Sequence, residues 1–381
     1  MGRPPGGRGP GGRSPQGARD ARAGGMSARG GPVLVTGGAG FIGCNIADRL
    51  ACDGHEVIVF DALTREGVAQ NLAWLKARHG AKIVHLGADT RDGRAVDEAV
   101  REAQAVFHMA AQVAVTTSLA DPVEDFQINV QGALNVLEAV RRKGARTPVI
   151  FASTNKVYGD LSDVPLELSG DAYRPVDAAL RVRGVGEHRP LDFHTPYGCS
   201  KGAADQYVLD YSRSFGVPTC VMRMSCIYGP RQMGTEDQGW VAHFLIRALE
   251  GQPISIYGDG RQVRDILNVA DAVEAYMAAW RRIDAVSGRA FNLGGGPNNA
   301  VSLMQLLGYI EELTHRKVEL AFAGWRAGDQ RYYVSDPSLA RRELALAEPL
   351  EWRTGVAQLA QWLTAERGPK GVRRQRAEAL S

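Results

Sequence analysis

The residues best suited to chemistry are a tyrosine and a lysine four positions apart, Tyr197 and Lys201. Thr195 followed by Pro196 predicts that a helix begins here, because Thr caps helix N-termini and Pro favours the first helical position. Side chains at this spacing share one face of a helix. An ammonium beside a phenol favours the phenolate, whose ordinary pKa of about 10 is otherwise too high for a base at neutral pH. The spacing predicts a base that takes a proton from an alcohol, although it also suits an ordinary surface helix.

A glycine-rich turn near the N-terminus gives this pair a context. Residues 36–43 read TGGAGFIG, directly after an apolar run and before a helical pattern. Glycines there let the backbone turn tightly and approach a pyrophosphate, and the helix N-terminus supplies partial positive charge. The same glycines also suit a turn that only packs a strand against a helix. The sequence predicts a dinucleotide-binding turn.

The acid expected to follow such a turn is Asp61, at the end of the next apolar run. A carboxylate there accepts hydrogen bonds from the adenosine ribose and repels a 2′-phosphate, which favours NAD over NADP. Arg65 lies close by and keeps NADP as an alternative. Further contacts are expected where later strands end, although Asp89 also suits a helix cap. The predicted NAD-binding residues are Gly37, Gly40, Phe41, Ile42, Gly43, Asp61, Asp89, Thr90, Ala110, Gln112, Tyr197 and Lys201.

Apolar runs of strand length alternate with helical patterns as far as residue 222. Strands are expected at 33–35, 57–60, 83–86, 105–109, 149–152 and 219–222, and helices at 41–53, 95–102, 123–143 and 196–215. This alternation is typical of a doubly wound parallel sheet, and strands so continuously apolar are covered on both faces. We therefore predict an α/β fold with a Rossmann-type doubly wound parallel sheet and a smaller C-terminal substrate-binding lobe.

Beyond residue 222 the alternation loosens into Gly- and Arg-rich loops, which we assign to the smaller lobe. The predicted division is a disordered tail at 1–31, an NAD-binding domain at 32–222 with 269–290 returning to it, a substrate lobe at 223–268 and 291–366, and a basic tail at 367–381. Gly, Pro and Arg dominate the first tail, and such a composition cannot build a core.

Composition excludes several classes of function. The 381 residues are 44% apolar, which is ordinary for a globular protein, and the basic tails leave the remaining body net negative. No nucleic-acid partner is therefore expected for the folded part. No apolar stretch is long enough to span a membrane, and no secretory signal is evident, so no membrane partner is expected. The five cysteines lack metal-type spacing and suit a reducing compartment, which predicts no metal and a cytoplasmic location.

Three strings in the chain resemble the extended short-chain dehydrogenase/reductase superfamily, in particular its nucleotide-sugar epimerases and dehydratases. They are residues 36–43, residues 151–159 with the sequence FASTNKVYG, and the Tyr-x-x-x-Lys segment, and the likeness covers roughly residues 32–365. In that superfamily a Ser or Thr four positions before the Tyr-Gly bonds the reacting hydroxyl, and Thr154 occupies this place. Dehydratases carry Asp-Glu directly after it, whereas Asn155 and Lys156 stand here, which argues against dehydration.

Longer strings are similar to the CDP-paratose 2-epimerases, also called CDP-tyvelose epimerases. They are residues 153–161, 191–207, 237–241, 262–265 and 329–331. The resemblance implies that NAD transiently takes hydride from C2 of a CDP-linked deoxysugar, and that the hydride returns to the opposite face of a 2-keto intermediate. It implies three catalytic residues, Thr154, Tyr197 and Lys201. Tyr197 then removes the hydroxyl proton, Thr154 holds the oxygen, and Lys201 anchors the nicotinamide ribose and lowers the pKa of the tyrosine.

The resemblance also implies a nucleotide-sugar-binding lobe, with guanidinium groups for the diphosphate. The predicted substrate-binding residues are Arg231, Trp240, Arg264 and Arg331. Two alternatives stay open: an enzyme of the UDP-hexose 4-epimerase type, and a protein that senses NAD or a sugar nucleotide without chemistry. In the superfamily, helices like those expected at 123–143 and 196–215 pair across a subunit interface. We therefore expect a homodimer, with a tetramer as the alternative.

Overall fold

The computed structural model describes residues 1–2, 30–144 and 146–367. The predicted tails at 1–31 and 367–381 lie largely outside these residues. Among the described residues, no helix combines the length and apolar character that crossing a membrane requires.

A central sheet of seven parallel strands confirms the predicted fold class. Its order is β12-β8-β5-β4-β1-β2-β3. The strands are β1 (Val33–Thr36), β2 (Val57–Phe60), β3 (Ile83–Leu86), β4 (Ala105–His108), β5 (Val149–Thr154), β8 (Thr219–Met224) and β12 (Arg289–Leu293). Every residue of β1, β4 and β5 is buried. This is why their sequences are apolar without alternation.

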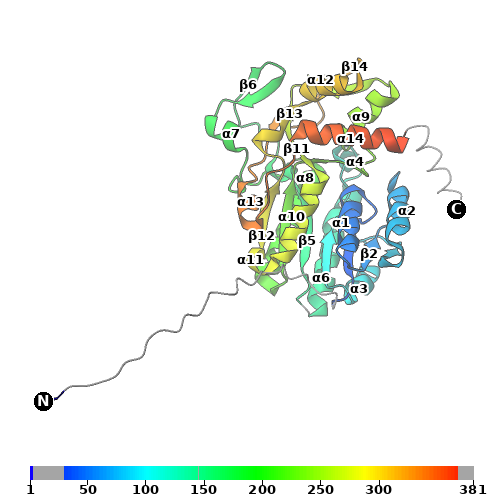
Figure 1. The fold of residues 1–381 in the computed structure, drawn as a ribbon, viewed down its shortest axis with the longest axis vertical. Coiled ribbons are helices and arrows are strands. Elements are labelled where there is room, and N and C mark those ends of the chain that lie inside the picture. Colours follow the sequence, from blue (N-terminus) through cyan, green and yellow to red (C-terminus); the bar gives the residue numbers. More distant parts are fainter. Residues whose placement is uncertain (3–29, 145, 368–381) are drawn as a thin grey trace.

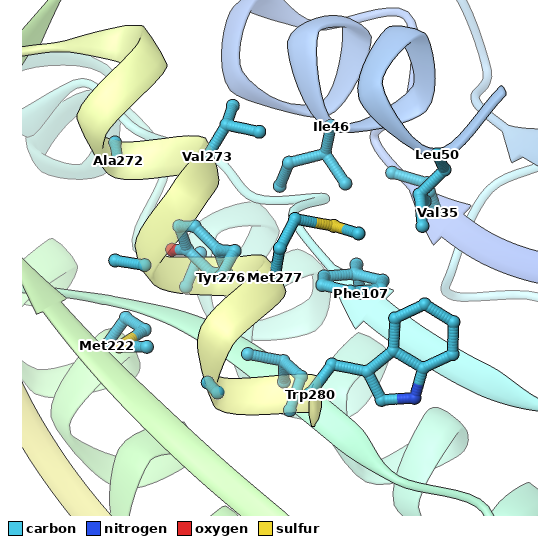
Figure 2. Packing of buried hydrophobic residues seen from close by; sticks show 14 of the residues in the cluster. Val35, Ile46, Leu50, Phe107, Met222, Ala272, Val273, Tyr276, Met277 and Trp280 are labelled. Atoms are coloured by element: carbon cyan, nitrogen blue, oxygen red, sulfur yellow. The ribbon is translucent and has the colours of Figure 1, made fainter. Parts of the chain in front are cut away.

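Helices cover both faces of the sheet. One layer contains α1 (Phe41–Cys52), α2 (Val68–His79) and α10 (Val269–Arg281), and the other contains α3 (Gly93–Arg101), α6 (Gly132–Lys143) and α8 (Thr195–Phe215). Successive residues of β1 point to opposite layers, with Val33 and Val35 in one core and Leu34 in the other. Figure 2 shows the first core, where Trp280 of α10 lies edge-on to Phe107 of β4, with ring centroids 5.8 Å apart.

The helix predicted at 123–143 is interrupted. The chain forms α5 (Pro122–Phe126), then a π-helical turn, η2 (Gln127–Gln131), and then α6. The turn places the Asn129 side chain within hydrogen-bond reach of Asp125 (3.2 Å) and of the Ser200 hydroxyl on α8 (3.0 Å). π-turns of this kind are frequent at functional sites, and the spacing of apolar residues does not predict them.

The second lobe lies at one end of the central sheet, where Figure 1 shows α9, α12 and α14 gathered. Its own core unites these three helices with small sheets. Its elements are β9 (Cys226–Tyr228), α9 (Trp240–Glu250), β10 (Ile254–Tyr257), β11 (Val263–Asn268), β13 (Ala300–Ser302), α12 (Leu303–Thr314), β14 (Leu320–Ala323), β15 (Tyr332–Tyr333) and α14 (Trp352–Arg367). Between β11 and β13 the chain returns to the central sheet as α10 and β12, so the return ends at Leu293 rather than at residue 290.

Shorter elements complete the connections. They are η1 (Gly80–Lys82), α4 (Val115–Ala120), η3 (Asn155–Tyr158), the hairpin β6 (Leu166–Ser169) and β7 (Ala172–Pro175), α7 (Ala178–Arg183), α11 (Ile283–Val286), η4 (Pro297–Asn299) and α13 (Ser338–Leu344). Of these, η3 matters most for the site, because it continues directly from the end of β5.

Candidate active site

A cavity of about 660 Å³ opens between the carboxyl ends of the central strands and the second lobe. Its walls come from the glycine turn, the ends of β2, β4 and β5, the start of α8, and the loops around residues 231–240 and 326–329. Ligands of doubly wound sheets bind at this edge, and the volume lies in the range of small-molecule sites.

The glycine turn leaves no room for side chains. Gly37 has φ of +64°, and a Cβ there would meet the Ala110 amide nitrogen at 2.7 Å. A Cβ on Gly43 would lie 2.2 Å from the Gly37 carbonyl oxygen. Gly40 precedes α1 and supplies no side-chain cap, so the first backbone N–H groups of the helix remain available to an anion. This cradle fits the pyrophosphate of NAD.

Asp61 is fixed at the end of β2 beside this cradle. Its carboxylate accepts backbone hydrogen bonds from Ala39 at 3.0 Å and from Leu63 at 2.9 Å, and it lines the cavity. The neighbouring Arg65 donates to the Gln238 side chain of the second lobe. A carboxylate held in this way suits an adenosine ribose, so the residues present fit NAD.

Most of the other predicted NAD-binding residues line the cavity. Phe41, Ile42, Thr90 and Ala110 do so, as does Asp89. Asp89 is not the cap of α3, because Asp92 accepts the backbone N–H bonds there. The Asp89 carboxylate instead bonds the Arg91 guanidinium at 2.7 Å.

Gln112 departs from the prediction because it does not line the cavity. Its amide nitrogen donates to the Asp125 carboxylate at 2.9 Å and to the Ala114 carbonyl at 2.8 Å. The side chain therefore turns toward α5, away from the cofactor cradle. Gln112 lies in the segment after β4, as expected. The direction of its side chain is set by its hydrogen bonds to Asp125 and Ala114.

Thr154, Tyr197 and Lys201 all face the cavity. Thr154 is the last residue of β5, whereas the other two lie one turn apart at the start of α8. The helix begins at Thr195 itself with His194 at the N-cap position, one residue earlier than predicted, and the Thr195 hydroxyl accepts a hydrogen bond from the Gly198 amide at 3.3 Å. The Lys201 ammonium lies 4.3 Å from the centroid of the Phe151 ring on β5. Strand and helix thus bring together the three residues that the sequence pattern singled out.

Burial governs the ionisation of Tyr197 and Lys201. It raises the pKa of Tyr197 to about 12, which a hydrogen bond with Thr154 partly offsets and the Asp125 carboxylate reinforces. Burial also lowers the pKa of Lys201 to about 7, against the attraction of Asp205 and Asp125. The net shift of the Tyr197 pKa in the protein without NAD is therefore upward, because desolvation of the phenolate dominates, and the effect of Lys201 on this pKa stays a prediction.

A buried ion pair joins α8 to the neighbouring strand β8 close to Lys201. Asp205, one turn beyond Lys201 on α8, accepts two hydrogen bonds from Arg223 of β8, both at 2.9 Å. The Ser153 hydroxyl, next to Thr154, donates to the same carboxylate at 2.7 Å. These contacts set where the end of β5 lies relative to α8.

Among the predicted substrate-binding residues, Arg231, Trp240 and Arg264 line the cavity. The Arg231 guanidinium lies over the ring of Trp74 (4.1 Å) and that of Trp362 (5.4 Å), so it also joins α2 to α14.

Arg331 does not line the cavity and is exposed. Its guanidinium lies over the Trp325 ring at 5.3 Å. Arg326, which was not predicted, faces the cavity instead, 3.7 Å from the Tyr257 ring centroid and paired with Asp237 at 3.2 Å. Both arginines flank one Gly-Asp-Gln loop, and only the fold decides which one points inward.

Lys156 is a second residue that sequence reasoning left out of the site. It lines the cavity from η3, two positions after Thr154. The signal was present, because Lys156 lies in the string that carried the resemblance and stands where dehydratases have an acid.

Comparison with known proteins agrees with this geometry. The NAD dependent epimerase/dehydratase family matches residues 33–294. A CDP-paratose 2-epimerase of Salmonella typhi is 40% identical over 340 residues, covering 87% of this chain and 99% of that protein. A putative UDP-glucose 4-epimerase of Methanocaldococcus jannaschii is 30% identical, covering 87% and 98%. The UDP-glucose 4-epimerase of Thermus thermophilus, solved with NAD, has a TM-score of 0.73 and 30% identity, covering 89% of this chain and 99% of that one. The chain therefore belongs to the NAD-dependent epimerase/dehydratase family.

Proposed function

We propose that this protein inverts C2 of a CDP-linked deoxysugar, in the manner of CDP-paratose to CDP-tyvelose, through transient hydride transfer to NAD. The observation that carries the proposal is the meeting of Thr154, Tyr197 and Lys201 in a cavity where Asn155 and Lys156 replace an acidic pair. The 40% identity to a CDP-paratose 2-epimerase supports the choice of substrate.

The roles of the trio follow from their positions. Tyr197 takes the proton of the C2 hydroxyl and later returns it, while the Thr154 hydroxyl holds that oxygen. Lys201 binds the nicotinamide ribose. NAD, when bound, accepts the C2 hydride reversibly and brings a positive charge that favours the phenolate. The 2-keto sugar turns its other face before the hydride returns, so the stereocentre inverts without net oxidation.

The cofactor is held by the glycine turn, the N-terminus of α1 and Asp61. For the sugar nucleotide, we propose that Arg264 and Arg326 bind the diphosphate, since both guanidinium groups face the cavity and suit paired bonds to phosphate. Trp240 lines the same cavity and offers a ring on which a base can stack.

The test is NMR of CDP-, UDP- and GDP-sugars incubated with the protein in heavy water. Inversion at C2 of a CDP-sugar, with no deuterium at that carbon, supports the proposal. Deuterium at C2 would mean exchange with solvent and would refute a hydride shuttle. Inversion at C4 of a UDP-hexose would favour the second candidate, to which the Methanocaldococcus and Thermus relatives point. Bound NAD without any turnover would favour a sensor, which has no need of the trio.

We further propose a homodimer, with a tetramer as the alternative. Exposed apolar side chains lie on α4, α5 and α8, and we refer to them together as the apolar patch: Leu119, Val123, Phe126, Tyr207 and Phe215. The helices that carry it pack on one another. Contiguous apolar patches on a surface mark interaction sites, and a twofold axis lets one patch cover its own copy.

All five cysteines are free thiols, which suits the cytoplasmic location that we propose.

A further inference from the structure

Lys156 lies beside the reacting position without a role so far. Its backbone N–H donates to the Thr154 hydroxyl oxygen at 3.2 Å, so the two residues are directly linked. Its ammonium reaches across the cavity to the Gly328 carbonyl oxygen at 3.0 Å. An ammonium has three donors. That bond therefore orients the group and leaves donors for a ligand in the cavity.

The loop that holds the ammonium is itself tied to η3. The Asn155 amide donates to the Gln330 side chain at 3.1 Å, and Gln330 donates to the Gly159 carbonyl at 2.6 Å. Lys156 is thereby fixed before any ligand arrives, and a group ordered in advance loses little entropy on binding.

The charges around Lys156 favour an anion. Burial and the Arg264 guanidinium of β11 lower its pKa to about 8, and Asp329, Cys226 and Asp160 oppose this shift. Asp329 is already paired with Arg264 at 2.8 Å. Two cations thus repel each other at one end of the cavity. An anionic oxygen between them would relieve that repulsion.

We propose that Lys156 binds the phosphate attached to C1 of the sugar and thereby places C2, rather than C4, at Tyr197; this rests on the proposed function. In a nucleotide sugar the glycosyl phosphate is bonded through oxygen to C1, which adjoins C2, whereas C4 lies on the opposite side of the ring. Lys156 and Thr154 line the same cavity, so a phosphate bound by Lys156 brings the C1 side of the sugar to Thr154, and C2 is the ring carbon next to C1. An enzyme acting at C4 needs its phosphate anchor farther from the reacting hydroxyl.

The experiment compares the affinities of CDP and CMP by calorimetry in the NAD-loaded protein, because only CDP carries the phosphate that corresponds to the one on C1. Lys156→Met should weaken CDP binding by about 10- to 100-fold, the loss expected for a charge-assisted hydrogen bond, and leave CMP binding unchanged. The pair UDP and UMP is measured in the same way, so the result does not depend on the base. Lys143→Met is the control, since Lys143 also donates to a backbone carbonyl but lies outside the cavity.

A pH series supplies a second readout. CDP affinity of the wild type should fall above about pH 8 as the ammonium loses its proton, whereas Lys156→Arg should keep its affinity at alkaline pH because a guanidinium stays charged. Equal loss of diphosphate and monophosphate binding in Lys156→Met, or no loss at all, would overturn the assignment. Inversion at C4 by the wild type would refute C2 placement and the proposed function together, while the phosphate contact is judged separately from the binding data.

Discussion

Tyr197 and Lys201 are both driven toward their neutral forms by the cavity that they line. Burial raises the pKa of Tyr197 to about 12 and lowers the pKa of Lys201 to about 7. A positive charge beside the phenol favours the phenolate, so we expect bound NAD to lower the pKa of Tyr197. Activity of the base is in this way tied to a loaded cofactor.

Tyr197→Phe should keep bound NAD and lose turnover by about a hundredfold or more, because it removes the group that moves the proton and leaves the glycine turn intact. Released NAD is measured by mass spectrometry and turnover by NMR. Wild-type turnover in this variant would reject Tyr197 as the base.

Asp125→Asn should move the rising limb of the kcat–pH profile to lower pH. The Asp125 carboxylate raises the pKa of Tyr197, so its removal lets the phenol lose its proton more easily. The amide oxygen can still accept the hydrogen bonds from Gln112 and Asn129. Asp121→Asn, which keeps the exposed cap of α5, should leave the limb in place. A limb that does not move in Asp125→Asn contradicts the electrostatic explanation.

Arg326→Ala should raise KM about tenfold or more with little change in kcat, since a diphosphate contact is lost. Arg331→Ala, five positions along the chain but outside the cavity, should leave KM unchanged. Initial rates over a range of substrate concentrations measure both. The opposite ranking of the two variants would restore Arg331 as the anchor.

At this scale, sequence reasoning succeeded where a side chain's position follows from local geometry. Tyr197 and Lys201 share a helix face by spacing, and Thr154 ends a strand. It did not anticipate that Gln112 and Arg331 lie outside the cavity, because their directions depend on contacts that the fold creates, with Asp125 for Gln112 and with Tyr173 and Trp325 for Arg331. Nor could it give the upward shift in the Tyr197 pKa, since burial is a property of the folded molecule.

The elements of the site are held by contacts that no periodicity reveals. All six expected strands and the helices at 41–53, 95–102 and 196–215 are present within a few residues of their predicted ends. The strands form continuous apolar runs and the helices show periodic apolar spacing, and both patterns can be recognised in a sequence. The interruption of 123–143 by η2 was not predicted, because it depends on hydrogen bonds from Asn129 to α5 and α8.

Asp205→Asn should destabilise the fold by about 3–5 kcal/mol, because Arg223 would remain buried without its counter-charge. The side chains of this pair are 0% and 5% exposed. Asp210→Asn on the same helix breaks an exposed ion pair with Arg213 and should change stability little. Urea unfolding midpoints compare the two. Similar midpoints would mean that the buried pair does not hold α8 to the sheet.

At the scale of the whole molecule, the second lobe and the central sheet are interleaved. The chain leaves the sheet after β8, builds β9 to β11 of the second lobe, and returns as α10 and β12 before finishing the lobe. Composition and alternation predicted the central sheet, but the pairing of strands in the smaller lobe depends on short segments such as β15 that carry no pattern of their own.

Phe126→Glu should convert the proposed homodimer to a monomer, because a charge would be buried within the proposed interface. Phe126 is 55% exposed in the single chain. Phe322→Glu, at a similarly exposed position on β14, should leave the mass unchanged. Light scattering after size-exclusion chromatography gives the mass, and circular dichroism checks folding. A wild type that is already monomeric would refute the dimer.

The late return of α10 and β12 has an evolutionary consequence. A fragment ending at residue 222 would lack the helix whose Trp280 covers Phe107, and β8 would be left as an unpaired edge. We therefore expect that this nucleotide-binding half, cut at residue 222, cannot be transferred by recombination to another protein as an independently folding unit.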